Sequence, residues 1–185
     1  MAQMRNITPG YVVIHPNRER SICRLTKLAV VAVLLGSVAL MMVLTVGGWS
    51  KLQGMQPVNF IWAAVYLVMA VYVWRWARGL LPIAAVLAML LLVIAAIAAL
   101  GWDGTSWFDR GRGFAPPQSL FGGGGLSTGT LGALTVVLIV VEAALVVIAA
   151  VGFVQSWNVE LEVPEEEARR RGSRTIARGP GAVAA

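Results

Sequence analysis

One acidic residue lies in the middle of a long apolar stretch. Glu142 is the only charged residue between Leu131 and Phe153. About 20 apolar residues are enough for a helix to cross the roughly 30 Å hydrocarbon core of a bilayer. A carboxyl group at mid-span costs roughly 2.5 to 3.5 kcal/mol on insertion scales, so it is expected to face protein or trapped water. The sequence therefore predicts a polar position inside a membrane domain.

Polar side chains at similar depth are expected around Glu142. Ser37 and Tyr66 lie near the centres of two other apolar stretches, within roughly 3 Å of the depth of Glu142 at about 1.5 Å per helical residue. Thr45 and Thr135 match each other in depth, about two helical turns from mid-span on the side away from the two termini. We expect Ser37 or Tyr66 to hydrogen-bond Glu142, with the face that carries Thr135 and Glu142 turned into a helix bundle.

Two interpretations of Glu142 remain open. No Lys or Arg lies at the depth of Glu142 in the apolar stretches, so the carboxyl is expected to be protonated and neutral. It is then a hydrogen-bonding anchor, either within the chain or to a partner subunit. Alternatively, it is part of a proton or cation relay. A relay normally needs a second titratable group along its path, and the other stretches offer none, so we favour the anchor.

The sequence has few residues that could bind a metal or haem or act as a catalytic nucleophile. His15 is the only histidine and Cys23 the only cysteine, which leaves no ligand set for haem or zinc and no intrachain disulfide. Ser37 has no histidine in the apolar stretches to activate it as a nucleophile. We therefore expect no cofactor, no metal and no enzymatic activity.

The apolar stretches predict an all-α, polytopic membrane protein with a four-transmembrane-helix bundle. Hydrophobic residues make up 58% of the chain and charged residues only 13%, and the charges gather at the ends and in the connections. A basic segment, residues 1–27, precedes a membrane domain, 28–157, and a charged, partly disordered tail, 158–185, follows it. The predicted spans are residues 28–48, 58–77, 80–100 and 131–153.

The distribution of basic residues predicts the orientation. Of the 15 Lys and Arg residues, all but Lys51, Arg110 and Arg112 lie on the side of the two termini. By the positive-inside rule both termini are cytoplasmic, and the long loop, residues 101–130, is extracytoplasmic. We expect the aromatic first half of this loop to lie on the membrane surface. Three tryptophans are expected at the cytoplasmic interface: Trp74, Trp76 and Trp157.

The net charge of +6 is interpreted as an interaction with lipid rather than with nucleic acid. The basic residues flank the spans and form no continuous basic face. Long basic side chains at helix ends extend toward anionic lipid headgroups. The candidates for these contacts are Arg18, Arg20, Arg24, Lys27, Arg75 and Arg78.

Small residues at helical spacing predict close helix contacts in two spans. In span 1 they are Ala29, Ala32, Gly36 and Ala39, and in span 3 they form the pairs Ala84/Ala88 and Ala95/Ala99. Such faces let two membrane helices approach closely. We expect them to bind a membrane-protein partner or a second copy of the chain.

Together these features favour a small, non-catalytic accessory, scaffold or assembly subunit of a larger membrane complex. The alternative is a proton- or cation-coupled small transporter or channel component that uses Glu142. The Ala-, Gly- and Arg-rich composition and the compact loops indicate the cytoplasmic (inner) membrane of a bacterium.

Overall fold

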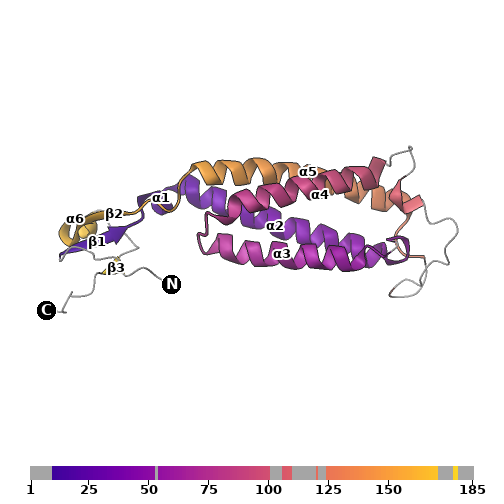
Figure 1. The fold of residues 1–185 in the computed structure, drawn as a ribbon, viewed down its shortest axis with the longest axis horizontal. Helices are drawn as coiled ribbons and strands as arrows, with labels where there is room; N and C mark the ends of the chain where they lie inside the picture. The colour runs from indigo at the N-terminus through magenta and orange to yellow at the C-terminus, as the bar shows by residue number, and fades with distance from the viewer. Residues whose placement is uncertain are drawn as a thin grey trace.

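The structure is a computed structural model that describes residues 10–52, 54–100, 106–109, 120, 124–170 and 177–178. Within these residues the chain is mostly helical, and four long helices form an elongated bundle (Figure 1). A small sheet and two short helices lie beyond one end of the bundle. We call this end, with β1 and α6, the terminal end, and the opposite one the loop end.

Four helices are long and apolar enough to cross a membrane. Their bounds follow the predicted spans closely, although α2 begins earlier than expected and α3 ends earlier. The start of α5 is fixed by Ser127, whose side chain accepts a hydrogen bond from the backbone N–H of Thr130. The helices are α2 (Ser21–Gly47), α3 (Gln56–Trp74), α4 (Leu80–Leu100) and α5 (Thr128–Val154).

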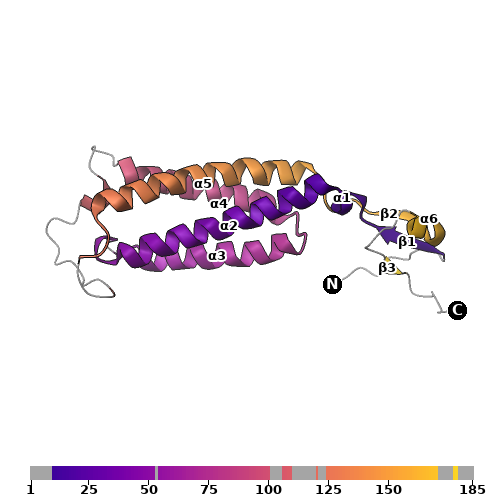
Figure 2. The same cartoon turned by 180° about the vertical axis from the view of Figure 1, so that it is seen from behind.

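The four helices surround a common core but do not contact each other equally. α5 packs extensively against α4 and also against α2, while α2 packs against α3. α3 and α4 follow each other in the chain but contact each other least among neighbours in the bundle. Figures 1 and 2 show α4 and α2 on opposite faces. The bundle is therefore closed on three sides and loosely joined along the α3–α4 side.

The start of α5 is held against the end of α2 by a close backbone contact. The N–H of Leu126 donates to the carbonyl oxygen of Gly47 at 2.8 Å. Gly125 has a φ of +65°, and a Cβ atom there would lie 2.6 Å from the same oxygen. Only glycine fits both the backbone angle and the space. Two short 3-10 helices also lie at the loop end: η1 (Trp49–Lys51) and η2 (Trp107–Asp109).

The two ends of the chain form a small module at the terminal end. The strand β1 (Tyr11–Ile14) lies between β2 (Leu161–Pro164) and β3 (Ala177–Arg178), and it pairs antiparallel with both. In the register, Tyr11 faces Pro164 and Val12 faces Arg178. The short helix α1 (Pro16–Glu19) links β1 to α2, and α6 (Glu165–Arg170) follows β2.

This module corrects the expectation of an all-helical protein. Val12, Ile14 and Val163 are buried together with Ala168 of α6, so the module has a small apolar core of its own. α6 has acidic and basic residues four positions apart, a spacing that favours a helix, and Arg169 pairs with Glu165 at 2.8 Å. The tail is therefore structured in part, with a strand and a helix directly after the bundle.

Candidate functional site

Glu142 lies inside the bundle and is hydrogen-bonded to a neighbouring helix. Its carboxyl oxygen Oε2 accepts a hydrogen bond of 2.8 Å from the hydroxyl of Tyr66. Both side chains are completely buried, at 0% exposure. The bond joins α5 to α3 across the core, as expected from the matching depths of the two residues. In a low-dielectric interior such a bond also satisfies groups that would otherwise be costly to bury.

Ser37 brings α2 to the same position. Its side chain is also 0% exposed, and it lies close enough to Glu142 to interact with the carboxyl. Within the described part of the chain, however, Ser37 Oγ and Glu142 Oε1 have no hydrogen-bond partner. The Glu142 carboxyl therefore lies between three helices, with a hydroxyl of α3 bonded to it and a hydroxyl of α2 beside it.

Trp62 extends this cluster along α3 and was not among the predicted site residues. It lies one helical turn before Tyr66 and interacts with the Tyr66 hydroxyl. Its Nε1 is buried without an acceptor in regular hydrogen-bonding geometry among the described residues. The i, i+4 spacing of Trp62 and Tyr66 was the available signal, since such residues share one face of a helix. We call Ser37, Trp62, Tyr66 and Glu142 the central polar cluster.

Thr45 and Thr135 are buried as expected but do not belong to this cluster. Thr45 donates to the carbonyl oxygen of Met41 at 2.6 Å and accepts from the side-chain amide of Asn59 at 3.0 Å. Thr135 donates to the carbonyl oxygen of Leu131 at 2.8 Å. Both hydroxyls are therefore bonded to their own helices, nearer the loop end, and the Asn59 bond also joins Thr45 of α2 to α3.

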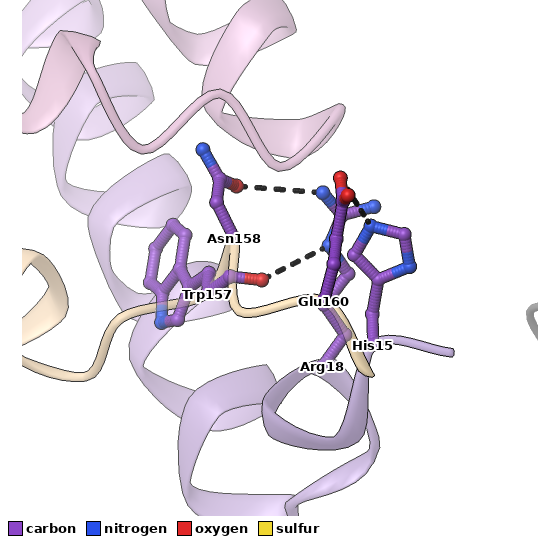
Figure 3. Close-up of polar contacts among 5 residues, drawn as sticks. All are labelled: His15, Arg18, Trp157, Asn158 and Glu160. Carbon is purple, nitrogen blue, oxygen red and sulfur yellow. Dashed lines mark hydrogen bonds and ion pairs between the residues drawn. The ribbon is translucent and has the colours of Figure 1, made fainter. Parts of the chain in front are cut away.

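The terminal end of the bundle is tied together by basic side chains. Arg18 donates from Nε to the carbonyl oxygen of Trp157 at 3.2 Å and from Nη2 to Asn158 Oδ1 at 3.4 Å (Figure 3). Beside it, His15 Nε2 lies 3.5 Å from Glu160 Oε1. These contacts join the segment before α2 to the segment after α5, about 140 residues apart in the chain.

Two further cations bind the C-terminal ends of α3 and α5. Lys27 Nζ lies 4.2 Å from the ring centroid of Trp76 and donates to the carbonyl oxygen of Trp74 at 3.4 Å. Arg78 donates to the carbonyl oxygen of Phe153 at 2.8 Å and lies over its ring at 4.5 Å. A cation at a helix C-terminus is stabilised by the helix dipole, and its contact with an aromatic face adds to this.

These contacts change the interpretation of the six basic side chains assigned to lipid headgroups. Arg18, Lys27 and Arg78 bind backbone carbonyls or rings of this chain. Arg20, Arg24 and Arg75 are exposed, although Arg24 Nε also donates to the carbonyl oxygen of Arg18 at 3.2 Å. Headgroup binding stays a prediction for all six, while the first three also have a structural role.

Trp157 lies in the core rather than at the lipid interface, which corrects the sequence-based expectation. It is 0% exposed and packs edge-on against Trp76, with ring centroids 5.5 Å apart. Trp76 and Ser156 have φ angles of 68° and 51°, which are uncommon for residues other than glycine. We call Lys27, Trp76 and Trp157, with Arg18, the terminal aromatic cluster.

An apolar pocket of about 290 Å³ lies in the half of the bundle toward the loop end. The predicted placement of the loop aromatics on the membrane surface is wrong for Phe108, which is 7% exposed and lines this pocket. Asn59 and Thr135 are the polar side chains among otherwise apolar lining residues and Trp107. The lining residues are Leu44, Leu52, Met55, Asn59, Leu91, Ile94, Ala95, Ile97, Ala98, Trp107, Phe108, Thr135 and Leu138.

The two predicted small-residue faces differ in where they point. Ala32, Gly36 and Ala39 of α2 are exposed, so this face is open to lipid or to a partner. In α4, by contrast, Ala84 and Ala88 are 0% exposed and serve the close packing of α4 within the chain. The α4 face is therefore not an outward contact surface, which corrects the expectation for span 3.

Comparison with protein-family models, with curated proteins and with solved structures gave no match. Among the residues that the structure describes, no three His, Cys, Asp or Glu side chains gather where they could hold a metal ion. The chemistry of the site therefore depends on the central polar cluster, the terminal aromatic cluster and the pocket.

Proposed function

We propose that this chain is a non-catalytic accessory, scaffold or assembly subunit of a larger membrane complex. The observation that carries the proposal is the outward-facing small-residue face of α2. A Cβ atom added at Gly36 would meet no other atom within 4 Å, and Ala32 and Ala39 are exposed beside it. Small residues on a lipid-facing surface let the helix of another membrane protein approach closely.

In this proposal Glu142 is an internal anchor. It bonds to Tyr66 of the same chain and interacts with Ser37 of a third helix. Hydrogen bonds between transmembrane helices contribute about 0.6 kcal/mol on average and up to about 1.7 kcal/mol. Together with the terminal aromatic cluster, this contribution keeps the bundle rigid enough to present the α2 face.

The proposal is tested by purifying the tagged chain in a mild detergent and identifying the proteins that accompany it. We expect a defined membrane protein to copurify with the wild-type chain. Ala32→Leu places a bulky side chain on the α2 face and should remove that protein. Ala64→Leu, at an exposed position of α3, is the matched control and should retain it. Copurification that is absent, or equal in both variants, would contradict the accessory role.

The alternative function is that of a proton- or cation-coupled small transporter or channel component. The observation that favours it is the pair Glu142 Oε1 and Ser37 Oγ, both buried without a hydrogen-bond partner in the described residues. A carboxyl oxygen that is not fully bonded can exchange a proton or accept a cation. Proton uptake by vesicles that contain the purified chain is the discriminating measurement.

We further propose that both termini lie in the cytoplasm and that the protein resides in the cytoplasmic membrane of a bacterium. The excess of Lys and Arg on the side of the termini supports this orientation. In a Cys23→Ser background, Leu120→Cys should react with a membrane-impermeant maleimide on intact cells. Asn158→Cys, exposed at the opposite end, should react only after the cells are opened. The reverse pattern would overturn the orientation.

A further inference from the structure

The apolar pocket lies between α3 and α4 in the half of the bundle toward the loop end. Its lining residues on α4 run from Leu91 to Ala98, which is about 10 Å in the second half of that helix at about 1.5 Å per residue. On α3 it begins beside the first residues of the helix, with Met55 and Asn59. The pocket is therefore at the depth of one leaflet of the membrane.

The pocket has a structural cause in the way α3 and α4 are connected. A short turn joins the two helices at the terminal end, where Ala77 N–H donates to the carbonyl oxygen of Tyr72 and Leu80 N–H to that of Ala77. Figure 1 shows the two helices separating away from this turn, and their contacts with each other are few overall. Thr135 and Leu138 of α5 and Leu44 of α2 form the inner wall.

The outer border of the pocket consists of lipid-facing side chains. Ile94 is 36% exposed and Ile97 is 48% exposed, and both line the pocket. In a chain that spans the membrane, the medium around these side chains is hydrocarbon rather than water. A molecule already dissolved in the bilayer can therefore enter from the side, between the two helices.

We propose that this pocket takes one hydrocarbon chain of a phospholipid from the leaflet at the loop end. The lining offers little polarity to an occupant, because Thr135 already donates to Leu131 and Asn59 already donates to Thr45. Its volume of about 290 Å³ lies at the lower end of the roughly 300 to 1,000 Å³ of small-molecule sites. A slender apolar chain fits such a space better than a multi-ring cofactor.

Trp107 provides a polar contact for the head of the same lipid. It lines the pocket from η2, and its Nε1 is buried with no acceptor among the described residues. An indole N–H can only donate a hydrogen bond, and tryptophan is typical of the level where acyl chains meet headgroups. An ester or phosphate oxygen of the bound lipid supplies the acceptor.

The test uses the purified chain in vesicles of phosphatidylethanolamine and phosphatidylglycerol. A small fraction of the phosphatidylglycerol carries a diazirine in its acyl chain, and the cross-linked residues are mapped by peptide mass spectrometry after irradiation. We expect the label to concentrate on Leu91–Ala98 and on the first two turns of α3. Ala98→Phe fills the pocket and should lower this labelling about tenfold, which corresponds to about 1.4 kcal/mol of binding free energy.

Ala96→Phe is the matched control, because Ala96 is also half-buried on α4 but does not line the pocket. Labelling of this variant should equal that of the wild type. Label spread evenly over exposed positions such as Ile61 and Val86, or equal labelling of the two variants, would overturn the proposal. A pocket filled by this chain's own loop would leave Leu91–Ala98 unlabelled and would overturn it too. The distribution in the wild-type chain decides the question even if Ala98→Phe fails to fold.

Discussion

The two halves of the helix bundle are held together by different kinds of contact. Toward the terminal end, Trp157 is completely buried and edge-packed on Trp76, and cations bind the carbonyl ends of the helices. Toward the loop end, α3 and α4 separate around an apolar pocket of about 290 Å³. The closed half fixes the arrangement of the helices, and the open half has room for a ligand from the membrane.

The central polar cluster lies at the boundary between these halves. The bond from Tyr66 to Glu142 joins α3 to α5, and Ser37 of α2 lies beside the carboxyl, but no side chain of α4 bonds to the cluster in the described residues. α4 is instead held by close packing of Ala84 and Ala88. α4, the helix without a polar partner in this cluster, is also the helix that supplies most of the helical lining of the pocket.

Removing one tryptophan from each half of the bundle tests most strongly whether the two halves are packed differently. Trp157→Ala should lower the free energy of unfolding by about 3 to 5 kcal/mol, because it leaves a large cavity in a closed core. Trp107→Ala should cost about half as much or less, because Trp107 is only partly buried and already borders a pocket. Thermal unfolding in detergent, followed by size-exclusion chromatography, measures both. Equal losses would mean that the two halves do not differ as described.

Tyr66→Phe tests the central polar cluster with a smaller change. The variant keeps the ring but removes the hydroxyl that donates to Glu142, so we expect a loss of about 0.6 to 1.7 kcal/mol. Tyr72→Phe, at a position 51% exposed, is the control and should change stability by less than about 0.5 kcal/mol. A Tyr66→Phe protein as stable as the wild type would show that the hydrogen bond from Tyr66 to Glu142 does not stabilise the bundle.

Ser156→Gly tests the backbone beside Trp157. Ser156 has a φ of 51°, and the left-handed region costs a residue with a side chain about 1 to 2 kcal/mol more than glycine. Part of this gain is lost because glycine gives the unfolded chain more freedom. We expect a net stabilisation of about 0.5 kcal/mol. A decrease in the unfolding temperature would show that the Ser156 side chain has a role of its own.

The smallest expected effect is a pH dependence at the terminal module. Burial, reinforced by the positive charge of Arg18, lowers the pKa of His15 below its ordinary value of 6.5. The carboxylate of Glu160 at 3.5 Å acts in the opposite direction, without reversing the shift. Below about pH 6.5 the unfolded chain therefore binds a proton that the folded chain does not. The free energy of unfolding decreases as the pH is lowered from there to the lowered pKa of the folded state.

Hydrogen exchange of the β1 and β2 amides at about pH 7.5 and about pH 5.5 measures this effect, since these values lie on either side of an ordinary histidine pKa. Protection should weaken at the lower pH in the wild type and change less in His15→Gln. Stronger protection at the lower pH would mean that the contact with Glu160 is the larger influence.

Much of the membrane domain could be predicted from the sequence because its signals are local. Long uncharged stretches bounded by Gly, Pro or basic residues place most helix ends to within a few residues, as α4 (Leu80–Leu100) illustrates. The exception is the start of α2, which lies at Ser21 and not at residue 28. Counting residues from the span centres also brought Glu142 and Tyr66 to the same depth. Helical rise per residue is nearly constant, so depth in a straight span is a simple function of position.

The remaining features depend on contacts between distant parts of the chain. The four residues of β1 become a strand only because they pair with Leu161–Pro164 and Ala177–Arg178, and such short segments carry no periodic signal of their own. The structural role of Arg18 has no local signal in the sequence, because its partner, Trp157, lies far along the chain. The pocket results from the divergence of α3 and α4, which hydropathy does not report.

The central claim, that Glu142 is a neutral anchor in an accessory subunit, is tested most directly by Glu142→Gln. The amide keeps the size of the side chain and can still accept from Tyr66, but it cannot exchange a proton. Unfolding temperature, copurifying partner and proton uptake by reconstituted vesicles are measured on the same preparation. Our account predicts a stability loss of about 1 kcal/mol at most, a retained or slightly weakened complex, and proton uptake equal to that of the wild type. Loss of proton uptake with stability and assembly intact would contradict it and would establish the relay instead.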